Sequence, residues 1–149
     1  MKKNFLLTLS AIVLSIAFSA FSNKRGGDVF QIYLNGKQVH QQFVHIDKSP
    51  KTIQLSSLKE NDNIAVFYSH CGNSGKNRVL TIKNEKEEVV RVLKFPDAAD
   101  NRSRMSFSAK DMSKIKNHKL RLYYTSQEIP DGMFLATLNW GNGQSFAKL

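Results

Sequence analysis

The sequence predicts an all-β fold, an antiparallel β-sandwich of Ig-like or jelly-roll layout. Apolar and polar residues alternate with a period of two through most of the chain after residue 28, and these segments are rich in β-branched and aromatic side chains. Turn-forming residues interrupt them every several positions, which favours a sandwich or barrel over a helical or βαβ fold. We count about nine strands, a number typical of sandwiches, and expect one short helical turn among them.

The first 22 residues have the layout of a secretory signal peptide. Two lysines follow Met1, and the stretch from Phe5 to Phe21 carries no charge. Small residues at Ala20 and Ser22 predict cleavage after Ser22, with Ser19 as the alternative site. An uncleaved membrane anchor is the competing interpretation, but the apolar run is at the short end of the ~20 residues that a span requires and several hydroxyl side chains dilute it.

This signal predicts export to the periplasm or the extracellular space. It divides the chain into a signal peptide (1–22), a flexible mature N-terminus (23–28), a β-sandwich domain (29–140) and a tail (141–149). A single cysteine cannot form an internal disulfide in that oxidising setting, so the stability of the domain must come from its core.

The Asn35-Gly36 pair between residues 29–34 and residues 37–44 predicts a β-hairpin. Both residue types tolerate positive φ, as the type I′ turn requires. The Ser108–Asp111 spacing is that of a capping box and predicts a helical turn that contains Met112 and Ile115. Further strands are expected at 52–55, 64–69, 78–83, 89–95, 105–108, 120–126 and 133–140.

The segment Tyr-Ser-His-Cys-Gly-Asn-Ser-Gly-Lys-Asn-Arg at residues 68–78 is the richest in reactive side chains. It supplies His70, Cys71, Lys76 and Arg78 as weak candidates for a binding site, and His70 with Cys71 as weak catalytic candidates. A phosphate-binding loop is excluded because His70 replaces the first glycine of that motif and a strand follows. We prefer a structural interpretation, a loop with Cys71 buried at the strand end and with Lys76 and Arg78 in water.

Two other kinds of site receive only weak support. A copper or zinc site would draw on Cys71, His40, His45, His70 and His118, but none of their spacings is diagnostic, and His40 and His45 would face opposite sides of a strand. No cofactor motif is present. An aromatic platform for a sugar or peptide is the alternative to a core position for five residues whose strand spacing is more typical of a core: Tyr33, Tyr68, Tyr123, Tyr124 and Trp140.

Several of these segments also suggest a family. The chain resembles a group of small exported bacterial proteins of unknown function, through Tyr-Leu-Asn-Gly-Lys, Tyr-Ser-His-Cys-Gly with Gly-Lys-x-Arg, Lys-Phe-x-Asp at residues 94–97, and Leu-Tyr-Tyr-Thr-Ser-Gln-Glu. The resemblance covers nearly all of the mature chain and implies no particular activity.

The formal net charge is +10, from 22 lysines and arginines against 12 acids. Such a balance is compatible with an anionic partner, such as a polyanionic glycan, or with a protein partner in the cell envelope. The bases are scattered rather than clustered, which is also typical of a solvated surface. Export argues against nucleic acid, and membrane contact is expected only through an uncleaved signal.

We therefore expect a non-enzymatic binding or interaction module. The alternatives are a cysteine-dependent enzyme or redox protein that uses Cys71, or a Cys/His metal-binding protein.

Overall fold

The computed structural model describes residues 27–44, 49, 51–55, 58, 59, 61–71, 75–100, 103–113 and 119–139. The predicted signal peptide and its cleavage site, Trp140 and the tail lie outside these residues. Within them, no helix has the length and apolar character that crossing a membrane requires.

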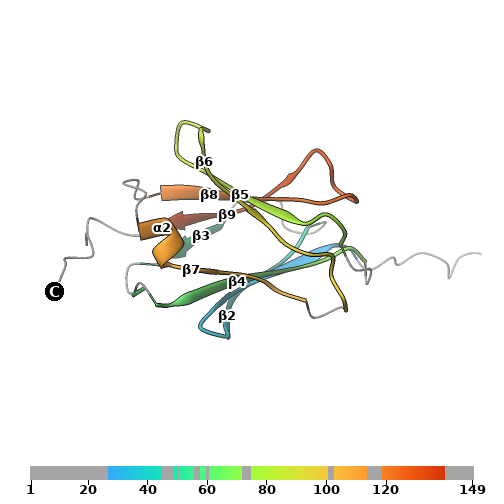
Figure 1. Cartoon of the computed structure of the whole chain (residues 1–149), viewed down its shortest axis with the longest axis horizontal. Coiled ribbons are helices and arrows are strands. Elements are labelled where there is room, and N and C mark those ends of the chain that lie inside the picture. The colour runs from blue at the N-terminus through green and yellow to red at the C-terminus, as the bar shows by residue number, and fades with distance from the viewer. Residues whose placement is uncertain are drawn as a thin grey trace, which may run out of the picture.

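The described residues form nine strands in two sheets, as the sequence predicted (Figure 1). The strands are β1 (Val29–Leu34), β2 (Lys37–Phe43), β3 (Lys51–Gln54), β4 (Asn63–Ser69), β5 (Val79–Lys83), β6 (Val89–Lys94), β7 (Met105–Ser108), β8 (Lys119–Thr125) and β9 (Met133–Asn139). The four-stranded sheet has the order β2-β1-β4-β7, and the five-stranded sheet has the order β3-β9-β8-β5-β6. The last strand, β9, is internal to the five-stranded sheet.

Local sequence chemistry places two of these elements. Asn35 and Gly36 have φ of 49° and 80°, so both central residues of the β1–β2 turn are left-handed and the predicted hairpin is confirmed. At α2 (Lys110–Ser113), the Ser108 N–H donates to Asp111 Oδ2 at 3.2 Å and the Lys110 N–H donates to Ser108 Oγ at 3.2 Å. The predicted capping box is therefore present, while Ile115 lies outside the described residues.

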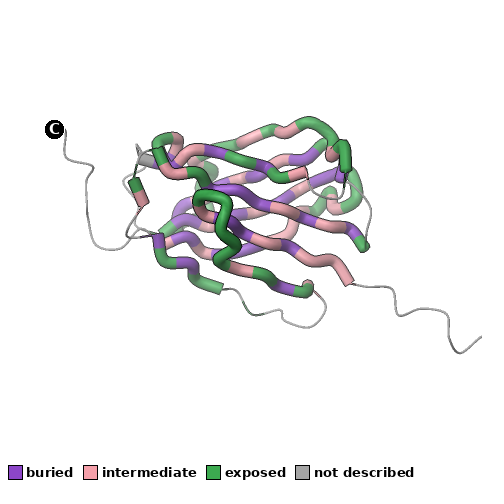
Figure 2. Tube along the Cα trace, turned by 90° about the horizontal axis from the view of Figure 1, so that it is seen from below, coloured by how far each residue is buried: buried purple, intermediate pink, exposed green. Residues whose placement is uncertain are grey.

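The core lies between the two sheets, and its side chains come from alternate positions of the strands. Figure 2 shows buried stretches alternating with partly buried and exposed ones along the chain. Among the large side chains with less than 2% of their surface exposed are Phe30, Ile32, Ile64, Leu80, Ile82, Leu122, Tyr124 and Leu138. Burial of one such side chain stabilises the fold by about 1.5–3 kcal/mol relative to an exposed one.

A stacked tyrosine pair joins the two sheets. Tyr68 on β4 and Tyr124 on β8 have ring centroids 4.5 Å apart and ring planes 17° apart. Such an aromatic pair contributes about 0.5–1.5 kcal/mol beyond the area it buries. In a domain with one cysteine, this pair supplies an inter-sheet contact that does not depend on a disulfide.

One strand pair corrects the expectation of a wholly antiparallel fold. β3 runs parallel to β9, with Lys51 opposite Ala136 and Gln54 opposite Asn139. The chain leaves the four-stranded sheet after β2 and enters the other sheet at β3, so no hairpin sets the direction of β3. Parallel pairing requires such a crossover rather than a tight turn, and the alternation pattern of four residues cannot reveal it.

Candidate functional site

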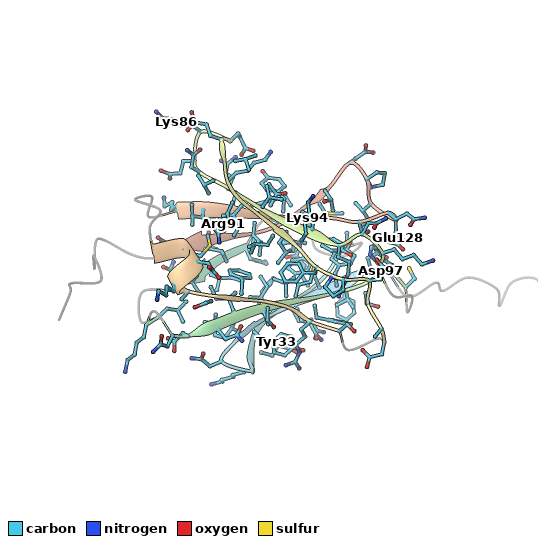
Figure 3. The ribbon with its side chains drawn as sticks, viewed as in Figure 1. Tyr33, Lys86, Arg91, Lys94, Asp97 and Glu128 are labelled. Carbon is cyan, nitrogen blue, oxygen red and sulfur yellow. The ribbon has the colours of Figure 1, made fainter. Side chains whose placement is uncertain are left out.

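The candidate residues from the sequence lie at one end of the molecule, where β4 and β8 end and β1 and β5 begin (right in Figure 1). Asp28 precedes β1 at this end, and described residues of three connections meet here: 70, 71 and 75–78 after β4, 95–100, 103 and 104 after β6, and 126–132 after β8. Glu128 and Asp97, from two of these loops, lie close to each other at this end in Figure 3.

His70 occupies the centre of this loop end with only 7% of its surface exposed. Its Nε2 lies 3.0 Å from the Tyr124 hydroxyl and 3.3 Å from Ser126 Oγ. Two carboxylates flank the ring, with Asp28 Oδ2 3.7 Å from Nδ1 and Glu128 Oε2 3.8 Å from Nε2. The imidazole thus connects the end of β4 to the start of β1 and to the loop that follows β8.

Cys71 is exposed, which corrects the expectation that it is buried. Strand β4 ends at Ser69, and a left-handed backbone at Cys71 (φ 52°) turns its side chain out of the alternating pattern. The thiol donates a hydrogen bond to Asp28 Oδ1 at 3.3 Å, while the Tyr68 hydroxyl donates to Asp28 Oδ2 at 3.0 Å. Burial and the neighbouring Asp28 charge raise the pKa of Tyr68.

Arg78 is buried, with 4% of its surface exposed, so the expectation that it lies in water is wrong. Its Nε donates to the Pro96 carbonyl and its NH1 group donates to the Ser103 carbonyl, both at 2.9 Å. The guanidinium thereby holds the loop between β6 and β7 against the start of β5. Lys76 is exposed, as expected, and its backbone N–H donates to Glu128 Oε2 at 3.2 Å.

Gly75 makes the close packing of this loop end possible. A Cβ at this position would lie 2.5 Å from the Tyr124 hydroxyl oxygen and 3.2 Å from His70 Nε2. Its carbonyl accepts a hydrogen bond from the Ala98 N–H at 2.9 Å. The glycine is therefore required by space, because its backbone passes directly over buried polar side chains.

The residues Ser126, His70 and Asp28 have the composition of a hydrolytic triad but not its geometry. The contact between His70 Nδ1 and Asp28 is 3.7 Å, longer than a hydrogen bond. Ser126 Oγ accepts hydrogen bonds from the N–H groups of Glu128 and Ile129 at 3.2 and 3.3 Å, and Ser126 is only 5% exposed. A nucleophile needs a free approach to its oxygen, so this cluster fits a structural role better than acyl transfer.

A thiol nucleophile fits no better. The Cys71 thiol donates to the Asp28 carboxylate, which is not the imidazole base that a Cys–His nucleophile requires. For metals, the described residues contain no group of three His, Cys, Asp or Glu side chains suited to hold an ion. His40 packs against Phe30 with ring centroids 5.5 Å apart, and His45 and His118 lie outside the described residues.

A second candidate region is the outer face of the five-stranded sheet, turned away from the core. Four basic side chains project from this side, and we term it the cationic face: Lys83, Lys94, Lys119 and Arg121. Strand register places them there, since Lys83 pairs with Arg121 and Lys94 pairs with Val79, while the intervening Leu80, Ile82, Leu120 and Leu122 are buried. Thr81 pairs with Tyr123 between these bases.

One carboxylate organises part of the cationic face. Glu87 contacts Arg121 and accepts a hydrogen bond from the Tyr123 hydroxyl at 3.1 Å, and Lys83 Nζ lies 3.4 Å from its Oε2. Partial desolvation raises the pKa of Glu87, but the hydrogen bonds from Arg121, Tyr123 and Lys83 outweigh it and lower the pKa overall. Lys83 Nζ also lies 4.6 Å from the centre of the Tyr123 ring. These contacts hold the Glu87, Lys83, Arg121 and Tyr123 side chains against one another.

The aromatic residues divide between core and surface. Tyr68 and Tyr124 belong to the core cluster, which confirms the core interpretation for them. Tyr33 is also buried but lies outside that cluster, where the Arg104 guanidinium carbon is 3.8 Å from the centre of its ring. Tyr123 is half-buried on the cationic face and packs against Phe134 with ring centroids 5.2 Å apart. Trp140 lies outside the described residues.

The sequence alone did not indicate which residues contact His70 or which residues contact one another on the cationic face. Asp28, Ser126 and Glu128 come from distant parts of the chain and meet His70 only in the fold. Lys83 and Arg121 were detectable, because each occupies a position on the polar side of an alternating strand. Pairing them required the β5–β8 register. Glu87, in the turn between β5 and β6, contacts Arg121 on β8.

Comparison with known proteins identifies no relative. No family model, no curated protein and no solved structure matches the chain.

Proposed function

We propose that the chain is an exported, non-enzymatic binding module whose cationic face binds an anionic polysaccharide of the cell envelope. The observation that carries the proposal is the position of Lys83, Lys94, Lys119 and Arg121 on one outer face. Among the described residues, Glu87 is the acid that forms ion pairs with bases of this face, and it contacts Lys83 and Arg121. At the loop end, in contrast, the polar groups are mostly buried and bonded to one another.

The chemistry of the face supports a sugar polymer among anionic ligands. Threonine hydroxyls at Thr81, Thr125 and Thr137 lie on the same side of the strands as the bases, as their pairing with Tyr123, Val79 and Arg121 indicates. Hydroxyls and ammonium groups donate hydrogen bonds to carboxylate, sulfate and sugar oxygens. The half-buried Tyr123 ring adds an amphipathic surface of the kind that sugar rings contact.

We further propose that the two sheets have Ig-like rather than jelly-roll topology. The order β1-β4-β7 corresponds to strands A, B and E, and β9-β8-β5-β6 corresponds to G, F, C and C′. In this assignment β2, which borders β1, and β3, which pairs parallel with β9, are additional to these seven strands. In this assignment Tyr68 and Tyr124 lie on strands B and F, the strands that the disulfide of antibody domains joins. Export, and the resemblance to small exported bacterial proteins, stay predictions that accompany this proposal.

The test measures binding of the exported protein to dextran sulfate, with neutral dextran as the ligand control. A Lys94→Gln/Lys119→Gln variant should bind about 10-fold more weakly, because two exposed charges on the face are lost. A Lys37→Gln/Lys59→Gln variant loses the same net charge elsewhere and should retain most of the affinity. Equal losses in both variants would show that only net charge matters, and the proposed face would be wrong.

Nucleic acid and anionic lipid vesicles serve as competing ligands in the same assay. The proposal predicts that dextran sulfate competes with both. Binding to vesicles alone, or tighter binding to single-stranded DNA that both double variants retain, would contradict a polysaccharide partner.

A further inference from the structure

The large hydrophobic side chains that are exposed among the described residues lie on two edge strands. Val39 and Phe43 on β2 are 42% and 47% exposed, and Val89 and Val92 on β6 are 56% and 50% exposed. Strand β2 is one edge of the four-stranded sheet and β6 is one edge of the five-stranded sheet. An exposed edge with apolar side chains is a template for pairing with another strand.

Of these edges, β2 lacks the usual protection. Proteins protect sheet edges with charged side chains or with short strands. Strand β6 carries Arg91 and Lys94, while β3 and β7 have only four residues each. Strand β2 has seven residues, and its sequence from residue 38 to residue 43, Gln-Val-His-Gln-Gln-Phe, contains no Lys, Arg, Asp or Glu.

The backbone of β2 is oriented for a further strand. The Val44 N–H donates to the Asp28 carbonyl at 2.9 Å, which fixes the residues of β2 that bond to β1. Because antiparallel ladders alternate, Gln42 bonds toward β1 while the N–H and C=O groups of Gln41 and Phe43 point to the open edge. The side chains of these two residues lie on the outer face, opposite Gln31 and Val29.

We propose that β2 pairs antiparallel with β2 of a second copy of this chain, about a two-fold axis at Gln41. In this register Gln41 faces Gln41 of the other copy, and Phe43 of each copy faces Val39 of the other. Both exposed apolar side chains of the edge are then covered, in two equivalent cross-strand pairs. The register shift that makes Val39 the extra residue of β2 lies at the end of the paired stretch.

Charge favours β2 over β6 as the edge through which two copies of the chain pair. The chain carries a formal charge of +10, so two copies repel each other wherever their basic surfaces meet. Pairing through β6 would bring Arg91 and Lys94 of both copies together, whereas residues 38–43 of β2 contain no Lys, Arg, Asp or Glu. An anionic partner, in contrast, has more to gain at the charged surfaces than at β2.

The dimer would have a consequence for binding, and this step rests on the proposed function. A two-fold axis through an edge-to-edge pair lies perpendicular to the joined sheets. The four-stranded sheets then form one continuous sheet of eight strands. The two five-stranded sheets lie on the same side of it, so both cationic faces point in the same direction. One polyanion chain can engage both faces, which raises avidity without new contacts.

The test is the oligomeric state of the exported protein, measured by sedimentation equilibrium at concentrations up to about 100 µM. The unaltered protein should form a dimer. A Val39→Lys/Phe43→Lys variant places lysines opposite each other in both cross-strand pairs and should dissociate at least ~10-fold more readily. A Val39→Lys/Phe43→Glu variant places lysine opposite glutamate and should restore the dimer, with an affinity that falls as salt is added.

A Val92→Lys variant is the matched control, because it adds the same charge at an exposed valine of the other edge, and it should dimerise at least as well as a single Val39→Lys variant. A monomer at the highest concentration, or equal affinities in the Lys/Lys and Lys/Glu variants, would overturn the proposed dimer. Circular dichroism confirms that each variant is folded. Dextran sulfate binding by a monomeric variant separates the two proposals. If the protein does not dimerise but still binds dextran sulfate, only the proposed dimer is refuted and the proposed function stands.

Discussion

Replacement of Gly75 by alanine tests how the loop end is built. The new Cβ would lie 2.5 Å from the Tyr124 hydroxyl oxygen, whereas ordinary contacts begin at 3.4 Å, so one of the two groups must move by 0.9 Å. Tyr124 has no room to move, because it is fully buried, stacks on Tyr68 and is hydrogen-bonded to His70.

The cost follows from these contacts. Overpacking of a buried site costs about 1–3 kcal/mol, and loss of the Tyr124 to His70 hydrogen bond adds about 1 kcal/mol. We expect Gly75→Ala to lower the free energy of unfolding by about 2–4 kcal/mol, which lowers Tm by on the order of 10 °C in a domain of this size.

A double-mutant cycle measured by urea denaturation isolates the clash. Tyr124→Phe removes the oxygen that the Cβ meets, so the double variant Gly75→Ala/Tyr124→Phe should be more stable than the sum of the single effects by about 1–2 kcal/mol. Gly36→Ala is the control. Its Cβ meets nothing within 4 Å, and its positive φ of 80° adds only a backbone cost that does not couple to Tyr124.

Two results would refute this reasoning. If Gly75→Ala has the stability of the unaltered protein, the backbone does not pass close to Tyr124. If the cycle shows no coupling while Gly75→Ala is destabilising, the clash lies with another neighbour.

Three further predictions concern charge. Glu87→Gln frees Arg121 and Lys83 from their carboxylate and should increase affinity for dextran sulfate several-fold in a binding titration; unchanged or weaker binding would place the ligand elsewhere. A lysine at position 78 cannot reach both carbonyl acceptors, so Arg78→Lys should lower the free energy of unfolding by about 1–3 kcal/mol. Arg91→Lys, at an exposed ion pair, should change it by less than about 0.5 kcal/mol. Equal effects of the two substitutions would show that the hydrogen bonds of Arg78 to the loop carbonyls do not stabilise the fold. Burial and the Asp28 charge raise the pKa of Tyr68 in the folded state, so the stability from its neutral form is complete below the unfolded value of about 10 and is lost as pH rises beyond it. Urea denaturation from about pH 8 to about pH 11 should show this loss, and Tyr68→Phe should show a shallower one; parallel curves would contradict the assignment.

Features with a local cause were predictable from the sequence. The Asn35-Gly36 turn and the Ser108–Asp111 capping box depend on a few neighbouring residues, and both are present. Strand positions were also predictable, because burial of one face imposes a period of two. Nine segments of this kind correspond to the nine strands of the described residues.

Features that depend on contacts between distant segments were not predictable. Arg78 looked like a solvated base, but loop carbonyls of Pro96 and Ser103 surround it. Cys71 looked like a buried residue at a strand end, until the left-handed backbone turned it outward. The cationic face required the β5–β8 register, which alternation alone does not supply.

The most direct test of the central claim is a map of the ligand on the protein. We propose to record backbone and side-chain NMR shifts of the exported protein during titration with a sulfated oligosaccharide. The account predicts that the largest changes lie on the cationic face, at Thr81, Lys83, Arg121 and Tyr123. Changes confined to the loop end around Cys71 and Lys76, or no saturable change at all, would contradict it.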